Sequence, residues 1–189
     1  MMRHRLLALS ALPLLALAAC NPGPPPAPPL PPLSKAAPLD TADASFVQTL
    51  NEADLVDIAL GNLAATHAGR NDVRALAATV VKDHTDDRTA LGKLVSPHDI
   101  TLTASPMRED QEMIDRLGKL YGTRFDSAFL THIKSGHVSL DRSLAQEIAT
   151  TKDGDLKTLA GSAQKMIAGH VATAEAIAPT RRTVRHRHR

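Results

Sequence analysis

Apolar residues recur every three or four positions along most of residues 40–179, with polar residues between them. This spacing is that of amphipathic α-helices, and the strict alternation typical of β-strands is missing. The chain is therefore expected to be all-α. The pattern predicts four long helices and one short helix, over about residues 43–67, 72–95, 107–120, 124–150 and 155–178.

The residues between these helices predict how the helices are connected. Gly69 and Pro97 are expected to end the first and second helices, and Asn71 is the expected N-cap of the second. Short first and last loops require antiparallel neighbours, whereas residues 96–122 are long enough to run from one end of a bundle to the other. The sequence thus predicts a ferritin-like four-helix bundle with a long crossover carrying a short extra helix. The alternative is a plain up-down-up-down bundle with an inserted helix.

The first 20 residues have the pattern of a bacterial export signal. Two arginines precede a short apolar run, which is shorter than the roughly 20 residues needed to span a membrane. The run ends in LAAC at 17–20, which resembles a lipoprotein lipobox, and Cys20 is the sole cysteine of the chain. Residues 1–19 are therefore a predicted lipoprotein signal peptide, and Cys20 is the predicted lipidation site. Asn21 stands where an inner-membrane retention signal has Asp, which favours the outer membrane and a periplasm-facing protein.

Composition sets two further segments apart from the helical domain at 40–179. Residues 21–38 hold nine prolines, so residues 20–39 are predicted to be a lipidated, polyproline-like tether. The domain itself carries 14 basic and 20 acidic residues, a net charge of −6. Residues 180–189 form a predicted disordered basic tail that contacts an anionic surface or an envelope protein, or acts only as a solubilising end. Its five basic side chains are Arg181, Arg182, Arg185, Arg187 and Arg189.

Each long predicted helix points one side chain of a metal-ligand type at its apolar face. On the second helix, His84 lies on the same face as the apolar residues three, four and seven positions away. The same test selects His137 and His170 on the last two helices and Asp57 on the first. Asp57, His84 and His137 lie near the middle of their helices. Side chains at the middle of packed helices lie at similar heights whichever way the helices run. Such a set suits zinc, copper or iron.

Two further aspartates could assist this set. Asp87 follows His84 by three residues, and Asp141 follows His137 by four, so each lies one turn along the same helix. Asp86 is expected to face water. Besides a bound divalent transition metal, a metal-free network of histidines and aspartates and an acid/base site remain open interpretations. The Glu-x-x-His pairs of diiron carboxylate proteins do not occur here.

Four segments resemble one family: DIALGNLA (57–64), LAATVVKDHTDDRTAL (76–91), GTRFDSAFLTHIKSGHVSL (122–140) and HVATAEAIA (170–178). They are similar to the domain of unknown function 4142 family, whose members are bacterial envelope proteins regarded as ferritin-like. The family's first-helix acid is usually Glu, whereas Asp57 stands here, and this shorter side chain puts a shared metal site in doubt. The resemblance implies a fold and a location, and it carries no activity.

The function classes that remain are few. No phosphate-binding loop, nucleophile elbow or zincin motif is present, so kinase and hydrolase functions are excluded. The main hypothesis is a non-enzymatic, lipid-anchored envelope protein that binds a partner or supports resistance to envelope stress. The alternative is a metal-binding protein using the buried histidines, with redox catalysis at that metal as a weaker third. Nucleic acid is not expected as a partner of an exported protein.

Overall fold

The computed structural model describes residues 37–177, and these are almost entirely helical. Four long helices are α1 (Thr41–His67), α2 (Asn71–Val95), α4 (Thr123–Thr150) and α5 (Gly154–Ile177). A short 3-10 helix, η1 (Ser96–His98), and the short helix α3 (Arg108–Leu117) lie between α2 and α4. The prediction of an all-α chain with four long helices and one short one is confirmed.

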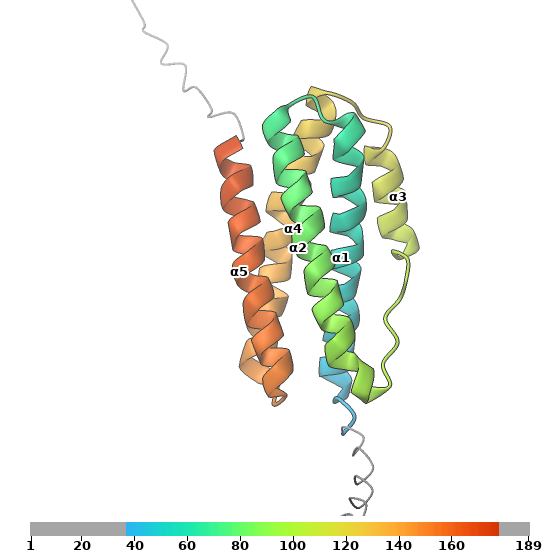
Figure 1. The fold of residues 1–189 in the computed structure, drawn as a ribbon, viewed down its shortest axis with the longest axis vertical. Helices are drawn as coiled ribbons and strands as arrows, with labels where there is room; N and C mark the ends of the chain where they lie inside the picture. The colour runs from blue at the N-terminus through green and yellow to red at the C-terminus, as the bar shows by residue number, and fades with distance from the viewer. Residues whose placement is uncertain (1–36, 178–189) are drawn as a thin grey trace, which may run out of the picture. The chain divides into compact units, whose positions relative to one another are not determined.

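The long helices form two antiparallel hairpins, α1–α2 and α4–α5, joined by a crossover that runs the length of the bundle (Figure 1). The end of α1 meets the start of α4, where the Gly122 N–H donates to the His67 carbonyl at 2.8 Å. The start of α1 meets the end of α4, where the Thr151 hydroxyl donates to Asp43 at 2.9 Å. Helices α1 and α4 are therefore antiparallel, so α2 and α4 run in the same direction. The long crossover is confirmed, and the up-down-up-down alternative is wrong.

Side chains cap two of the helices. The Asp40 carboxylate accepts from the backbone N–H groups of Ala42 and Asp43, both at 2.9 Å, and so begins α1. Asp153 does the same for α5, accepting from Leu156 at 2.8 Å. The predicted Asn71 cap is wrong, because Arg70 occupies the N-cap of α2 without a side-chain cap bond. Asn71 is instead the first residue of the helix, and its side-chain oxygen accepts from Arg74 at 2.8 Å.

One glycine sets how closely the first hairpin packs. A Cβ atom on Gly61 of α1 would lie 2.5 Å from Cγ2 of Val81 and 3.0 Å from the Ala77 carbonyl of α2. No real Cβ tolerates the first of these distances, so a side chain at this position would push the two helices apart. The hairpin that supplies His84 therefore depends on a hydrogen at position 61.

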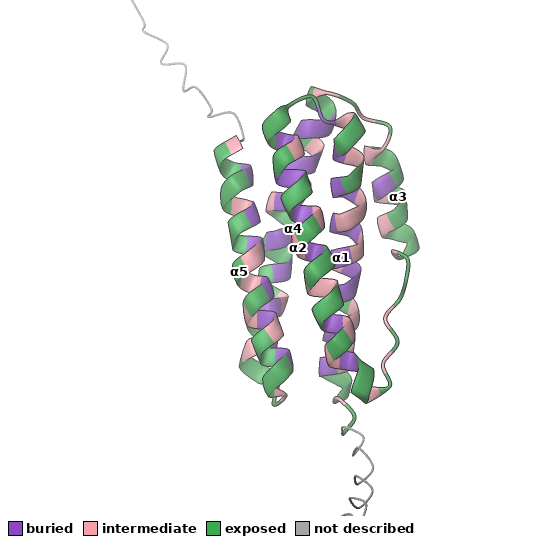
Figure 2. Cartoon of the chain, viewed as in Figure 1, coloured by how far each residue is buried: buried purple, intermediate pink, exposed green. Residues whose placement is uncertain are grey.

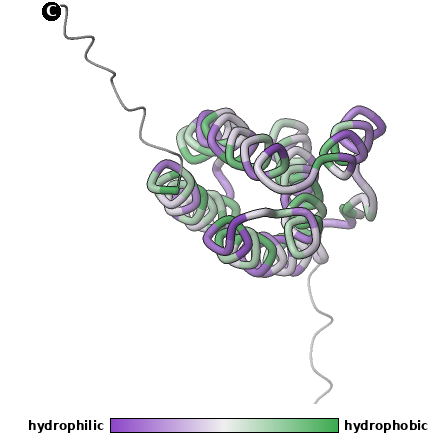
Figure 3. The backbone as a smooth tube through the Cα atoms, turned by 90° about the horizontal axis from the view of Figure 1, so that it is seen from above, coloured by the Kyte–Doolittle hydropathy of each residue, from purple (hydrophilic) through white to green (hydrophobic). Residues whose placement is uncertain are grey.

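Buried residues line the inner faces of the four long helices, and polar residues cover the outside (Figures 2 and 3). The apolar core is divided into two clusters along the bundle axis. Burying each large aliphatic or aromatic side chain contributes about 1.5–3 kcal/mol. Prominent members of the first cluster are Leu60, Val73, Leu76, Phe125, Phe129 and Ile133. Prominent members of the second are Leu50, Leu91, Leu144, Leu156 and Ile167.

The crossover is held against α1 by polar contacts. Asn51 is fully buried and donates to Thr103 at 2.9 and 3.1 Å, while its side-chain oxygen accepts from Arg88 at 2.9 Å. The Met107 N–H, just before α3, donates to the Glu52 carboxylate at 2.7 Å. These bonds fix the path of a segment that has little regular structure of its own.

Two buried acids, Asp43 of α1 and Glu147 of α4, lie together at the end of the bundle where α1 begins. They are called the acid pair below. Both are 5% exposed. Burial, a hydrogen bond with Asp43 and the charge of that residue raise the pKa of Glu147 to about 7. The pair is therefore stabilised by holding a proton.

No helix among the described residues is long and apolar enough to cross a membrane. The predicted signal peptide, Cys20, the tether up to residue 36 and the five tail arginines lie outside the described residues.

Candidate metal centre

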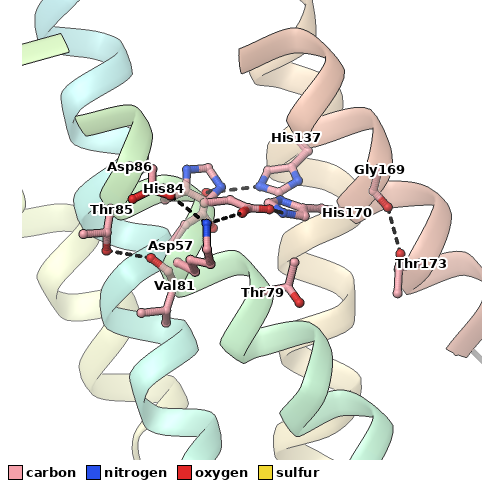
Figure 4. Close-up of polar contacts among 12 residues, drawn as sticks. Asp57, Thr79, Val81, His84, Thr85, Asp86, His137, Gly169, His170 and Thr173 are labelled. Atoms are coloured by element: carbon pink, nitrogen blue, oxygen red, sulfur yellow. Dashed lines mark hydrogen bonds and ion pairs between the residues drawn. The ribbon is translucent and has the colours of Figure 1, made fainter. Parts of the chain in front are cut away.

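Three histidines from three helices meet between the two apolar clusters (Figure 4). His84 of α2, His137 of α4 and His170 of α5 are 0%, 1% and 3% exposed. Their ring centroids form a nearly equilateral triangle with sides of 5.4, 5.4 and 5.5 Å. Each of the three helices thus has one histidine on its otherwise apolar buried face, and the three histidines lie at the same height in the bundle.

One nitrogen of each ring is held by a carboxylate. Nδ1 of His84 lies 2.8 Å from Asp54, Nε2 of His137 lies 3.2 Å from Asp57, and Nε2 of His170 lies 3.0 Å from Asp83. An imidazole facing a carboxylate carries its proton on the facing nitrogen and donates it. The three acids therefore fix both the orientation and the tautomer of the rings. These six residues are called the histidine layer below.

The other nitrogen of each ring has no hydrogen-bond partner within the described chain. These atoms are Nε2 of His84, Nδ1 of His137 and Nδ1 of His170, and all three are buried. Buried polar atoms in native proteins are nearly always paired, so three unpaired atoms in one layer need an explanation. With the protons fixed on the carboxylate side, Nδ1 of His137 and Nδ1 of His170 each present a lone pair in the neutral ring. Nε2 of His84 also lies 3.4 Å from the Asp57 carboxylate, so it presents a lone pair when the proton of the neutral ring is on Nδ1, facing Asp54.

The spacing of the three histidines suits one shared ion. Each can offer a ligand atom, and these atoms all lie within 4.8 Å of one another. Two imidazole nitrogens bound tetrahedrally to one zinc ion are about 3.3 Å apart. The ring nitrogens therefore have to approach one another by up to about 1.5 Å to share a metal ion. Within residues 37–177 this is the one such group of histidines, cysteines or acids.

Asp57 is buried next to His84 and His137 as predicted, but it does not belong to the group of side chains that can share one ion. One of its oxygens faces His132 at 3.0 Å, and the other lies 3.2 Å from His137 and 3.4 Å from Nε2 of His84. The carboxylate thus joins three histidines from two helices. Its geometry is that of a positioning group for His137, with His84 within reach.

The two auxiliary aspartates do not hold the rings. Asp141 is exposed and accepts from Gln164 at 2.9 Å, and it makes no hydrogen bond to His137. Asp87 makes no hydrogen bond to His84, and one of its oxygens is buried without a partner. Burial and the charge of Asp54 raise the pKa of Asp87 to about 7. Asp86 is exposed as predicted, and it pairs with Lys82 at 2.7 Å.

The charges of the layer oppose one another. Burial disfavours ionised Asp57, but hydrogen bonds from His132 and His137 outweigh it and hold the pKa of Asp57 well below its ordinary value. Burial raises the pKa of Asp54 to about 6, although its hydrogen bond with His84 acts in the other direction. The carboxylate of Asp57 is therefore held ionised, and its negative charge favours a cation near His84 and His137.

The histidines differ in how readily they bind a proton. Burial lowers the pKa of His170, and the nearby charges of His84 and His137 lower it further. Burial also disfavours charge on His84, but its bond to Asp54 and the charge of Asp57 raise its pKa overall. Because an imidazole binds a metal ion only in its neutral form, affinity at this site would rise with pH.

Three residues of this arrangement escaped the sequence prediction. Asp54 lies one turn before Asp57 on the same face of α1, so two acids in one apolar stripe were a usable signal. Asp83 neighbours His84 in the sequence but points to α5, and His132 reaches Asp57 from α4. Those two contacts depend on which helices are neighbours, which periodicity alone does not reveal.

Comparison with solved structures supports the fold. The chain is similar to a DUF305 fragment from Deinococcus radiodurans, with 14% identity and a TM-score of 0.66, over 75% of this chain and 97% of that one. It is also similar to a candidate spore coat protein from Bacillus halodurans C-125, with 14% identity and a TM-score of 0.60, over 74% of this chain and 87% of that one. Both relationships concern the helical fold alone.

Among curated proteins no significant match was found. The model of one family, described as a domain of unknown function (DUF4142), matches residues 28–177. This match spans all four long helices and every residue of the histidine layer. The chain therefore belongs to the DUF4142 family.

Proposed function

We propose that this domain binds a divalent transition-metal ion through His84, His137 and His170. The observation that carries the proposal is the convergence of three buried histidines, each with one ring nitrogen that makes no hydrogen bond, whose possible ligand atoms all lie within 4.8 Å of one another. A metal-free network would pair such atoms with protein groups, whereas a metal ion uses all three lone pairs at once. Imidazole ligands suit zinc, copper, iron and nickel.

The carboxylates give the site a second layer of support. Asp54, Asp57 and Asp83 each face the outer nitrogen of one ligand ring, an arrangement common around histidine-bound metals. It orients the ring and makes its inner nitrogen a better donor. Three protein ligands also leave a fourth position for water or another small ligand. Binding, storage or transfer of the ion needs no more than these parts.

The test is the metal content of untagged mature protein purified from the periplasmic side of the envelope. His186 and His188 lie in the tail, so a His186→Ala/His188→Ala variant controls for binding outside the bundle. We expect about one ion per chain, retained by this variant and by His98→Ala. His137→Gln and His170→Gln should lose it while remaining helical. Asp83→Asn should weaken affinity about 10- to 100-fold. Absence of stoichiometric metal after incubation with zinc, copper, iron and nickel would reject the proposal.

We further propose that the bundle is a periplasm-facing lipoprotein of the outer membrane, anchored through Cys20. The motif LAAC after a short charged and apolar segment supports this, and so does the use of a single cysteine. Fractionation of wild type and Cys20→Ser provides the test. The wild type should sediment with outer membrane and the variant should be released. Identical fractionation would contradict the anchor.

A further inference from the structure

We infer that metal ions reach the histidine layer through an acidic groove between α2 and α5. This inference rests on the proposed metal site and adds its access path. The groove has a volume of about 610 Å³, and its lining includes Asp83, Asp86 and Asp87 of α2 with Asp155 and Met166 of α5. Four carboxylates thus face one opening on the surface of the bundle.

The three ligand rings do not line the groove, but two of its acids lie next to the histidine layer. Asp83 lines the groove with 30% of its side chain exposed, and the same carboxylate accepts from Nε2 of His170, which is almost fully buried. Asp87 lies close enough to Asp54, the partner of His84, for the two charges to interact. One of its oxygens is buried and unpaired. The floor of the groove is therefore formed by the acids next to two of the three ligand rings.

The charge of the groove suits a cation. Lys82 lies at its edge, 2.7 Å from Asp86 and 3.9 Å from Asp83, and it neutralises part of the outer charge. Asp87 and Asp155 have no basic partner among the ion pairs of the described residues. A cleft lined by one sign of charge concentrates counter-ions and raises their association rate. We expect divalent cations to enter this groove and then to bind the ring nitrogens that make no hydrogen bond, on the inner side of Asp83.

A second cavity provides a matched control. It lies between α4 and α5, has a volume of about 330 Å³, touches His137 and carries the acids Asp141 and Glu175. It also offers two carboxylates near a ligand ring, but neither of them contacts the layer's acids or histidines through a hydrogen bond. Removing two charges at either opening changes the net charge of the protein equally.

The experiment measures Co²⁺ association by stopped-flow absorbance on the full-length mature protein with His186→Ala and His188→Ala. At low salt, Asp86→Asn/Asp155→Asn should slow association about three- to tenfold, and high salt should abolish the difference. Asp141→Asn/Glu175→Gln should associate at the wild-type rate. All three proteins should bind one ion at saturation.

The outcomes separate the access path from the site itself. Equal slowing of both double variants, slowing of the α4–α5 variant alone, or no slowing of either would overturn the path while leaving the metal site intact. A groove variant with less than one ion at saturation would also overturn it, because the acids would then be ligands. Failure of the wild type to bind Co²⁺, Zn²⁺ or Cu²⁺ would reject the proposed function instead.

Discussion

The histidine layer and the acid pair both bury ionisable groups in contact with α1 and α4, yet they solve the problem of buried charge differently. In the layer, each acid accepts a hydrogen bond from a histidine ring. In the acid pair, two carboxyl groups face each other, and a raised pKa keeps a proton on Glu147. The layer is stabilised by pairing and the acid pair by protonation.

The unpaired atoms of the two regions differ as well. The acid pair leaves a single oxygen of Glu147 without a partner, whereas the layer leaves three nitrogens from three helices. One isolated buried polar atom without a hydrogen bond lowers the stability of the folded state. Three buried histidines whose possible ligand atoms all lie within 4.8 Å of one another form a candidate binding site. Convergence of such atoms, more than burial alone, is what distinguishes a candidate functional site from a polar position in a core.

The largest expected effect comes from breaking the layer. His84→Ala removes a packed ring and leaves Asp54, which is fully buried, without its partner. We expect a loss of about 2–4 kcal/mol in the free energy of unfolding, measured by urea denaturation. Asp86→Ala, on the exposed side of the same helix, should cost less than about 0.5 kcal/mol. Similar costs for the two variants would mean that the layer does not hold the core together.

Metal removal should separate the two regions directly. An ion at 100 times its dissociation constant stabilises the folded state by about 2.7 kcal/mol. A chelator should therefore lower the melting temperature of the wild type and of Glu147→Gln, but not that of His84→Ala. If the response to the chelator disappears in Glu147→Gln, the ion is bound at the acid pair and not at the histidine layer.

A smaller effect is expected at the acid pair, and it depends on pH. The folded-state pKa of Glu147, about 7, lies above its ordinary value of 4.5. The stabilisation from its proton is therefore complete below about pH 4.5 and is lost as pH rises through about 7. Glu147→Gln keeps an uncharged side chain, so it should exceed the wild type by about 1 kcal/mol at pH 8 and match it near pH 4.

The control for this pH dependence is Glu175→Gln, which changes an exposed glutamate of α5. Its stability should follow the wild-type profile at every pH. Equal stability of Glu147→Gln and the wild type at both pH values would show that the acid pair holds no proton.

The smallest effect on stability is expected from removing Arg181–Arg189, because neither region includes these residues. The free energy of unfolding should change by less than about 0.5 kcal/mol, so the melting temperature should stay almost unchanged. Binding to vesicles containing anionic lipid should fall, and the difference should shrink as salt is added. Equal binding of the two proteins at low salt would leave the tail as a solubilising end.

The helical fold was predictable because its signals are local. The period of the apolar residues and the lengths of the loops around residues 69 and 152 predicted the hairpins, and the long 96–122 segment predicted the crossover. The three histidines were predictable for the same reason, since each occupies an apolar stripe near the level of the others. Asn71 failed as a cap because α2 begins one residue earlier than predicted, so that Asn71 is its first helical residue.

The partners of the histidines were only partly predictable. Asp141 and Asp87 were chosen because they lie one turn from a histidine on the same helix, but every carboxylate that holds a ring comes from a different helix. Helical spacing describes neighbours along one helix. Contacts such as Asp83 with His170 depend on the packing of α2 beside α5, which follows from the whole topology.

The crossover has a consequence for how the molecule is assembled. His84 belongs to the first hairpin, whereas His137 and His170 belong to the second, and the two hairpins are linked by a segment outside the four-helix core. Neither hairpin can complete the ligand set alone, so the site comes into existence only when the two halves dock. An ion bound there would link the α1–α2 hairpin to the α4–α5 hairpin. A chain cut within residues 99–106 should then separate into hairpins without the ion and reassemble in its presence.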